Sequence, residues 1–401
     1  MKTPPPIHIA TLTNFSVYSG QSIRLQQLIA HMSLRRTINL LTATPFPVEE
    51  PSASLTQCPW LNPGQSGQFR GDAFGLEGLR RIWRLALTLK SFLTKAPMVY
   101  TDIPLIVLCA AIYARRVKRI VEVNGIYSEE WVTKGYLAGK SDVRYHFMRA
   151  LEGWAMRSAH SIIAVSPGIR DYLIHEFRVK QGRITVIPNG IDLSTVNAKD
   201  SFQLALPPGP LAVFVGSFRP WHGVDNLVRA LPYALARVPS LKLILVGDGP
   251  ARAQCEQLAQ SLGVQKAVLF VGYQPQARAA AYISAADVCV YYPDYNIRGY
   301  GFMGDPIKLR EYMAAGKPIV TIRLSNFSEI VEQEQSGVVV EPGHQRFGEA
   351  LAELLSHPEG ARTFGANGRR AVADRFDWSI IADRILSVLD DHPVSAVPDR
   401  V

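Results

Sequence analysis

Short apolar runs alternate with longer amphipathic stretches along the chain, a pattern typical of β-strands alternating with α-helices. In the first half the expected strands are 7–12, 38–43, 98–101, 120–123, 161–165 and 184–187. A helix is expected at 22–33 and a basic helix at 76–93. Residues 44–75 are rich in Pro, Gly, Ser and Gln and lack periodicity, so we expect a long loop there.

The same alternation restarts after a polar stretch that ends in Pro207-Pro208-Gly209-Pro210, a composition typical of a linker. The expected strands are 211–215, 241–246, 268–271, 288–291, 318–322 and 338–340. The expected helices are 224–237, 251–262, 276–285, 306–315, 345–356, 359–374 and a last one at 378–389.

Apolar strands separated by helices favour parallel sheets that are covered on both faces. We therefore predict an α/β fold with two doubly wound, Rossmann-like domains facing across a cleft. The N-terminal domain is expected to span 1–195 and the C-terminal domain 207–378. Residues 379–401 are expected to return to the N-terminal domain, so that the last helix packs against it.

Length and composition agree with two globular domains, because the 401 residues are 47% apolar and 19% charged. The net charge of +9 is uneven: residues 1–195 carry +10 and the remainder −1. A basic half favours an anionic partner, although a solvated basic surface without a ligand remains the alternative. Nucleic acid is not expected, since no recognised nucleic-acid motif accompanies the charge.

The cellular setting is predicted from segments that the chain lacks. The N-terminus has no apolar core of a signal peptide. The longest apolar run, 105–114, is far shorter than the roughly 20 residues that span a bilayer. The four cysteines have no Cys-x-x-Cys spacing, so we expect reduced thiols and no metal site. We expect a cytoplasmic protein, peripheral at the inner face of a membrane.

The stretch 304–320 joins a loop, a helix and a strand and is the first candidate site. The loop Gly304-Asp305-Pro306-Ile307 leads into a helix whose free backbone N–H groups suit a phosphate. Lys308 and Glu311 share a face of the first turn, where a carboxylate can accept hydrogen bonds from two sugar hydroxyls. Gly316 is placed to end the helix in a left-handed conformation. The alternative is an amphipathic helix with a surface Lys–Glu pair.

Several other polar or glycine-containing turns follow predicted strands, and the carboxyl ends of parallel strands share one edge of a sheet. A single such turn needs no ligand, but their common placement predicts a binding site. The candidate residues in these turns are Gly20, Gly216, Ser217, Gly249, Gly272 and Tyr273.

Three segments of the chain resemble glycosyltransferase family four, which comprises retaining nucleotide-sugar transferases of two-Rossmann (GT-B) architecture. They are Pro188-Asn189-Gly190-Ile191-Asp192, Val246-Gly247-Asp248-Gly249-Pro250 and the stretch 304–320. The resemblance implies that Glu311 binds the ribose of the donor and that Gly304–Ile307 meets its sugar and diphosphate. It also implies that Gly20 closes over the diphosphate and that Gly272 and Tyr273 hold the nucleobase.

The chain departs from the family pattern at four positions. Met303 replaces a frequent glutamate, for which Asp305 is the candidate substitute. Ser217 and His222 align with the usual Arg and Lys of the turn after the first strand of the second domain. Asn124 stands where many members have a His near the acceptor. Asn can donate a hydrogen bond but cannot shuttle a proton near neutral pH.

Arg219 and Lys308 are therefore the cations that we assign to the diphosphate, with His222 assisting. The predicted reaction moves a sugar from a nucleoside-diphosphate-sugar donor to an acceptor hydroxyl, with the anomeric configuration retained. The acceptor is expected to be membrane- or lipid-linked and to be contacted by 76–93 and 115–119. We expect this reaction to serve the synthesis of a glycan, a glycolipid or a natural-product glycoside.

No obligatory cofactor or metal is expected, because no acidic cluster stands out in the sequence. The alternatives are a catalytically silent sugar-nucleotide-binding scaffold and a nucleotide-sugar epimerase or phosphorylase of the same architecture. The substitutions at Asn124, Met303 and His222 support the scaffold, whereas the groups that an epimerase or phosphorylase needs are not evident.

Overall fold

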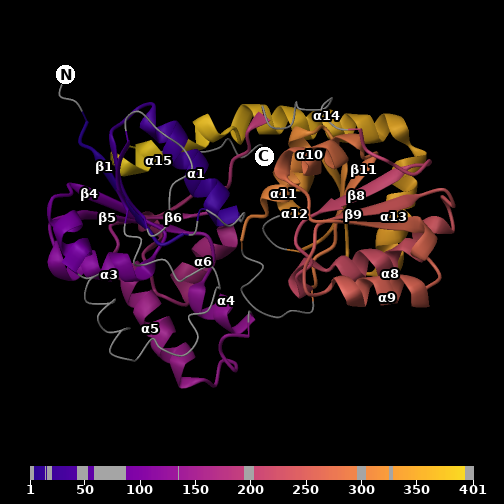
Figure 1. Cartoon of the computed structure of the whole chain (residues 1–401). Coiled ribbons are helices and arrows are strands. Elements are labelled where there is room, and N and C mark those ends of the chain that lie inside the picture. The colour runs from indigo at the N-terminus through magenta and orange to yellow at the C-terminus, as the bar shows by residue number, and fades with distance from the viewer. Residues whose placement is uncertain are drawn as a thin grey trace. The chain divides into compact units, whose positions relative to one another are not determined.

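A computed structural model describes residues 4–13, 15, 20–42, 53–57, 87–133, 135–193, 203–295, 304–324 and 328–392. The chain divides into two compact units (Figure 1). Among the described residues, the N-terminal unit holds 4–189, 304–305 and 378–392, and the C-terminal unit holds 190–295 and 306–377. Each unit is a parallel sheet covered by helices, which confirms the predicted α/β class.

The N-terminal unit is built on a seven-stranded sheet in the order β3-β2-β1-β4-β5-β6-β7, in which neighbouring strands are parallel. The strands are β1 (Ile7–Thr11), β2 (Ile38–Thr42), β3 (Ala53–Gln57), β4 (Met98–Thr101), β5 (Lys118–Val123), β6 (Ser161–Ala164) and β7 (Ile184–Val186). Chain order reverses direction between β1 and β4, so this is the topological switch point of the sheet.

Alternate residues of these strands pack against helices on opposite faces. Tyr100, Ile120 and Ile163 lie in one core with α1 (Gly20–Ser33) and α15 (Trp378–Leu389). Val121 and Ile162 lie in another core with α3, α5 and α6. The remaining helices of this unit are α3 (Pro104–Tyr113), α4 (Tyr127–Thr133), α5 (Val143–Ser158) and α6 (Pro167–His175), with the short η2 (Gln181–Arg183) before β7. The C-terminal helix α15 lies beside α1 (Figure 1), as predicted.

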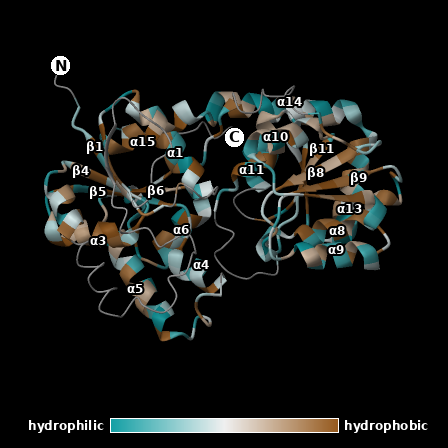
Figure 2. Cartoon of the chain, viewed as in Figure 1, coloured by the Kyte–Doolittle hydropathy of each residue, from teal (hydrophilic) through white to brown (hydrophobic). Residues whose placement is uncertain are grey.

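The C-terminal unit has a six-stranded parallel sheet in the order β10-β9-β8-β11-β12-β13. The strands are β8 (Leu211–Val215), β9 (Lys242–Val246), β10 (Val268–Gly272), β11 (Val288–Tyr291), β12 (Ile319–Ile322) and β13 (Gly337–Val340). The switch point lies between β8 and β11. Their hydrophobic side chains form the core of the unit, and these strands are brown in Figure 2.

Helices cover both faces of this second sheet. On one side α8 packs against α9 and α13, and on the other α11 packs against α10 and α14 (Figure 1). The helices are α8 (Val224–Leu235), α9 (Arg252–Ser261), α10 (Gln276–Ala285), α11 (Ile307–Ala314), α12 (Ser328–Gln333), α13 (His344–Ser356) and α14 (Pro358–Arg375), with the short η3 (Pro220–His222) and η4 (Gln265–Ala267).

The structure differs from the elements expected from the sequence in three details. The stretch 44–75 was expected to be a loop but contains β3, a short edge strand whose sequence, ASLTQ, has no apolar run. The helix α12 was not expected. Pro306 is the N-cap of α11 and does not lie in its first turn. Gly316 ends α11 with a φ of 66°, as predicted.

Two predicted features fall partly outside the described residues. Of the basic helix expected at 76–93, the structure describes helical residues from 87 onward. Met303 also lies outside them. No helix among the described residues is long and apolar enough to cross a membrane.

Candidate functional site

The loops after β8, β9 and β10 lie side by side at the carboxyl edge of the C-terminal sheet. Glycines allow their backbones to approach: a Cβ on Gly247 would lie 2.0 Å from the carbonyl oxygen of Gly216. The N–H of Gly247 donates to the carbonyl of Gly272 at 2.9 Å. A Cβ on Gly249 would lie 2.7 Å from the carbonyl oxygen of Phe218. The structure therefore brings together the predicted site residues Gly216, Gly249 and Gly272.

Gly247→Ala should destabilise the fold because the added Cβ meets backbone and cannot be relieved by a side-chain rotation. The residue also has a φ of 139°, which disfavours a side chain. We expect the free energy of unfolding to fall by about 3 kcal/mol in urea titration. Gly182→Ala is the matched control, because nothing lies within 4 Å of its Cβ position. Equal stability of the two variants would contradict the close approach.

Lys308 places its ammonium group between the carboxyl ends of the two strands that flank the switch point. Its Nζ lies 4.7 Å from the ring centroid of Phe214 on β8 and 4.6 Å from that of Tyr291 on β11. A Cβ on Gly216 would lie 2.7 Å from the same Nζ. The Nζ is buried and has no hydrogen-bond partner among the described residues. Burial lowers the pKa of Lys308 to about 7, against the opposing effect of Glu311.

A buried ammonium with no hydrogen-bond acceptor is costly unless a ligand supplies one. The faces of aromatic rings stabilise a cation less than hydrogen bonds to water or to an anion do. Ligands of doubly wound sheets bind outside the carboxyl ends of the strands at the switch point. Lys308 is therefore placed to meet an anionic group there.

Glu311 lies one turn further along α11, and its side chain is half-buried. Burial raises the pKa of this carboxyl, and the charge of Lys308 opposes the rise. The same helix is held from its other side, where Tyr312 accepts a hydrogen bond from the N–H of Val215 at 2.9 Å. α11 is thereby fixed against β8, with Lys308 and Glu311 in one turn.

The loop after β8 holds Ser217, Arg219 and His222. The Nδ1 of His222 lies 2.6 Å from the carbonyl oxygen of Ser217, so we assign the proton to Nδ1 and leave Nε2 as an acceptor. Burial and then the charge of Lys308 lower the pKa of His222 to about 3, so the imidazole is neutral at neutral pH. The guanidinium of Arg219 is exposed and stacks over Trp221 at 5.8 Å.

Tyr273, which follows β10, has an exposed side chain beside Gly272. Gly272 has a φ of 81°, and its Cβ position lies 3.3 Å from the Nη1 of Arg252. Arg252 is in turn held by Asp248 and Glu256 at 3.3 and 2.8 Å. A flat, exposed ring at the edge of these loops can stack on a planar ligand.

A second polar cluster lies at the carboxyl edge of the N-terminal sheet, around Glu122 on β5. The Nε of Arg24 lies 2.9 Å from Oε1 of Glu122, and both side chains are fully buried. Tyr100 donates to Oε2, and Nδ2 of Asn124 donates to Oε1 at 3.0 Å. This contact fixes the side-chain amide of Asn124 against Glu122. Burial by itself lowers the pKa of Arg24. The pKa is nevertheless raised, because Glu122, Tyr100 and Asp305 together outweigh the effect of burial.

Removing one partner of this ion pair should leave an uncompensated buried charge. We expect Arg24→Met to lower the free energy of unfolding by about 3–5 kcal/mol. The double variant Arg24→Met/Glu122→Gln should recover part of that loss, because the stranded carboxylate is gone. Arg170→Met, which breaks an exposed pair with Asp171, should cost under about 1 kcal/mol in the same denaturant series. A loss in Arg24→Met as small as in that control would contradict the burial of the pair.

Arg24 also fixes the segment that resembles the family motif at 188–192. Its guanidinium donates to the carbonyl of Pro188 at 2.8 Å and to Oδ1 of Asn189 at 3.2 Å. The N–H of Asn189 donates to Oδ2 of Asp305 at 2.6 Å, and its side-chain amide donates to the carbonyl of Asp305. The Cβ position of Gly304 lies 3.6 Å from the carbonyl oxygen of Asn124. Gly304 and Asp305 thus lie beside Asn124, and Asp305 Oδ2 is already used by Asn189.

Asp102 follows β4 at the switch point of the N-terminal sheet and was not singled out from the sequence. Its Oδ2 accepts hydrogen bonds from Thr13 at 2.7 Å and from Gln21, and its Oδ1 has no partner among the described residues. Burial raises the pKa of this carboxyl, against these hydrogen bonds. Gln21 follows Gly20, the exposed first residue of α1. The described residues show no group of three or more His, Cys, Asp or Glu placed to hold a metal ion.

Both halves of the chain are similar to known protein families. Residues 196–371 match the family described as "Glycosyl transferases group 1", and residues 19–195 match "Glycosyltransferase Family 4". Phosphatidyl-myo-inositol mannosyltransferase of Mycobacterium leprae is 32% identical over 209 residues, 51% of this chain and 52% of the relative. The first curated relatives are matched over a little more than half of their own length.

Two solved structures show the same fold along nearly the whole chain. Sucrose-phosphate synthase from Thermosynechococcus elongatus has a TM-score of 0.75 at 23% identity, covering 97% of this chain and 99% of its own. Anabaena HepE in complex with UDP has a TM-score of 0.70 at 17% identity, covering 96% and 100%. The chain therefore belongs to glycosyltransferase family four and has the GT-B fold.

Proposed function

We propose that the protein transfers a sugar from a nucleoside-diphosphate-sugar donor to an acceptor hydroxyl with retention of the anomeric configuration. The observation that carries this proposal is the buried ammonium of Lys308 at the switch point of the C-terminal sheet, which has no hydrogen-bond partner within the described part of the chain. A diphosphate supplies the hydrogen-bond acceptors that this group lacks. Family membership and the solved structure of HepE with UDP support a nucleotide as the ligand.

The donor would lie on the C-terminal unit along the three glycine loops. Glu311 accepts hydrogen bonds from the ribose hydroxyls, and Lys308 meets the diphosphate one turn earlier. The N–H groups at the start of α11, after Gly304, Asp305 and Pro306, add to the positive field there. Tyr273 stacks on the nucleobase next to Gly272.

The reaction breaks the bond between the anomeric carbon and the phosphate oxygen and forms a bond from that carbon to the acceptor oxygen. The departing diphosphate oxygen takes the acceptor proton on the same face, so the protein need not supply a base. Lys308 stabilises the charge that develops on the leaving group, and the exposed Arg219 is free to add a second contact. His222, neutral with Nε2 unprotonated, would accept a hydrogen bond from a donor hydroxyl.

On the N-terminal unit, Asn124 is the candidate contact to the acceptor. Glu122 holds its amide nitrogen, so its carbonyl oxygen is the group offered to an acceptor hydroxyl. This refines the expectation that Asn124 acts as a hydrogen-bond donor. A lipid-linked acceptor is the proposed class, because residues 1–195 carry +10 and one relative is named for phosphatidyl-myo-inositol. The proposed location is the inner face of a membrane.

Incubation with a panel of nucleotide sugars tests this proposal against its alternatives. Slow release of the nucleoside diphosphate and free sugar, abolished in Lys308→Met, is the expected result for a transferase that lacks its acceptor. Binding of a donor without turnover would instead favour the catalytically silent scaffold. Isomerisation of the sugar while it stays attached would favour an epimerase. Failure to bind any member of the panel would overturn the donor assignment itself.

A further inference from the structure

The helix α3, Pro104–Tyr113, is apolar on every side, yet one side of it faces solvent. Its sequence, PLIVLCAAIY, contains no charged residue, and it is brown in Figure 2. Ile106, Val107 and Ala110 are buried against the sheet, whereas Leu105, Ile112 and Tyr113 are exposed. A helix that is hydrophobic all round is normally buried in a protein core or a membrane. The exposed side of α3 therefore lacks the polar residues that water favours.

The neighbouring helix α5 carries an apolar stripe on its solvent side. Val143, Phe147 and Trp154 are 80%, 65% and 47% exposed, and Ala150 between them is exposed as well. Steps of four, three and four residues place all four on one line along the helix. Its inward face is formed by other residues, among them Tyr145, Ala155 and Met156. The stripe is thus additional to the side of α5 that packs on the core.

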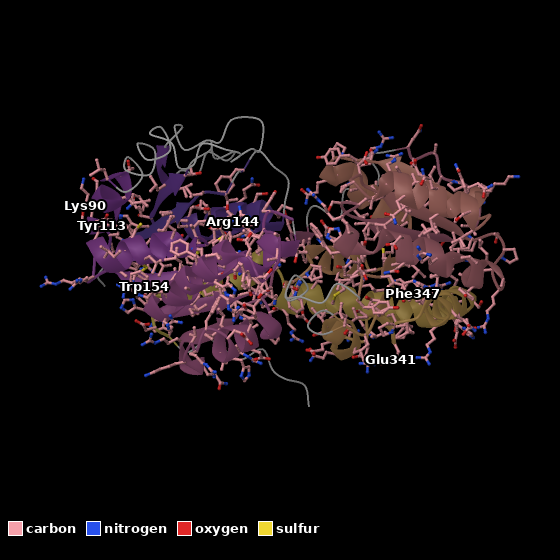
Figure 3. All side chains as sticks on the ribbon, turned by 90° about the horizontal axis from the view of Figure 1, so that it is seen from below. Lys90, Tyr113, Arg144, Trp154, Glu341 and Phe347 are labelled. Atoms are coloured by element: carbon pink, nitrogen blue, oxygen red, sulfur yellow. The ribbon has the colours of Figure 1, made fainter. Side chains whose placement is uncertain are left out.

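Helices α3 and α5 pack against each other on the same face of the N-terminal sheet (Figure 1). Contiguous exposed apolar surface on adjacent elements marks interaction sites in soluble proteins. We call the exposed side of these two helices the α3–α5 face. It consists of Leu105, Ile112, Tyr113, Val143, Phe147, Ala150 and Trp154; Tyr113 and Trp154 are labelled in Figure 3.

Positive charges outnumber negative ones around this face, although some of them are paired. Arg144 pairs with Asp142 at 2.7 Å, and Arg149 pairs with Glu176 at 2.5 Å. Arg157 is exposed, and the single acid within the two helices, Glu152, is buried. Glu152 accepts hydrogen bonds from the N–H groups of Tyr127 and Ser128 at the start of α4. Arg115 and Arg116 follow α3 directly and are exposed. The face therefore combines exposed apolar groups with cations.

We propose that the α3–α5 face docks on the surface of a bilayer that contains anionic lipids. Aromatic and aliphatic side chains enter the boundary between headgroups and acyl chains, and arginines contact lipid phosphates, as in interfacial helices. A second copy of the chain is a poorer occupant, because pairing this face with itself brings arginines against arginines. The inference rests on the proposed function only in that a lipid-linked acceptor gives the docking a purpose.

The test is sedimentation of the full chain with vesicles of equal parts phosphatidylcholine and phosphatidylglycerol. The wild type should bind these vesicles, bind pure phosphatidylcholine weakly and be released by salt. Phe147→Ser/Trp154→Ser should lower the partition coefficient about tenfold or more, because the groups that insert are removed. Tyr233→Ser/Leu262→Ser is the matched control, since both residues are similarly exposed on the C-terminal unit. Arg115→Glu/Arg116→Glu should weaken binding to the anionic vesicles alone.

Equal binding by the two double-serine variants, or no binding by the wild type, would overturn the proposal. A wild-type dimer that Phe147→Ser/Trp154→Ser converts to a monomer, without any vesicle binding, would show that a second copy covers the face. Binding of a nucleoside diphosphate should be the same in all of these variants. A wild type that binds vesicles but no nucleotide would refute the proposed function while leaving the docking surface standing.

Discussion

Glu311→Ala is expected to weaken binding of the donor nucleotide about a hundredfold, the equivalent of about 3 kcal/mol. The carboxylate is proposed to accept hydrogen bonds from two ribose hydroxyls, and its loss removes both charge-assisted contacts. The same loss should appear with the nucleoside alone, because the ribose is present there too. Titration calorimetry with the nucleoside and with the nucleoside diphosphate measures both.

Two further variants separate this role from a structural one. Glu311→Gln keeps the size of the side chain and one acceptor oxygen, so its affinity should fall between wild type and Glu311→Ala. Glu353→Ala, which removes an exposed acid from α13, should bind like the wild type. An unchanged affinity in Glu311→Ala, in a variant whose thermal unfolding is also unchanged, would refute the ribose contact.

Lys308→Met is expected to weaken binding of the nucleoside diphosphate about a hundredfold and to leave binding of the nucleoside unchanged. The wild-type affinity should also depend on pH. Burial lowers the pKa of Lys308 to about 7, and a bound diphosphate favours the ammonium form. Below pH 7 the group is already charged and affinity should be flat. Above pH 7, binding requires proton uptake. The affinity should therefore fall as pH rises, with a slope that approaches about tenfold per pH unit.

The neighbouring groups do not produce this profile. His222 has a pKa of about 3 and stays neutral throughout. In Lys308→Met the fall above pH 7 should disappear, whereas Lys266→Met, on the exposed η4 segment, should retain it. A fall of the same size in Lys308→Met would assign the pH dependence to another group.

The same shift predicts an effect on the stability of the nucleotide-free protein. A folded pKa of about 7 lies below the ordinary 10.5, so the unfolded chain binds more protons between these values. The contribution of Lys308 to the free energy of unfolding therefore rises with pH across this window. Lys308→Met should be more stable than the wild type near neutral pH and lose that advantage as pH increases. The buried ammonium thus lowers the stability of the nucleotide-free protein, and a bound diphosphate would offset this loss.

The apolar strands and amphipathic helices were predictable because local hydrophobic pattern and parallel topology agree in this chain. Strands β8 and β11 and helix α15 lie at the predicted bounds. Strand β3 was missed because its sequence, ASLTQ, contains no apolar run. The polar turns after strands correctly marked the carboxyl edge of each sheet, and the three loops after β8, β9 and β10 do lie together.

What the sequence could not predict are contacts that join distant segments. Arg24 resembled any basic residue of an amphipathic helix, and only the fold shows that it is buried against Glu122 and holds Asn189. The carboxylate oxygen of Asp102 that has no partner in the described part of the chain is likewise visible only in three dimensions. Lys308 was a candidate by position, but its burial between Phe214 and Tyr291, and hence its lowered pKa, depends on tertiary packing.

Glycosyl transfer from a nucleotide sugar with retention fixes the anomeric configuration of the first product, which can be measured. An α-linked nucleotide sugar that the protein hydrolyses slowly can be followed by proton NMR from the first turnover, before mutarotation mixes the anomers. With retention, the α-anomer of the free sugar should appear first, and Lys308→Met should form almost none. Initial release of the β-anomer would contradict retention, and release at the same rate in Lys308→Met would contradict the role of this site.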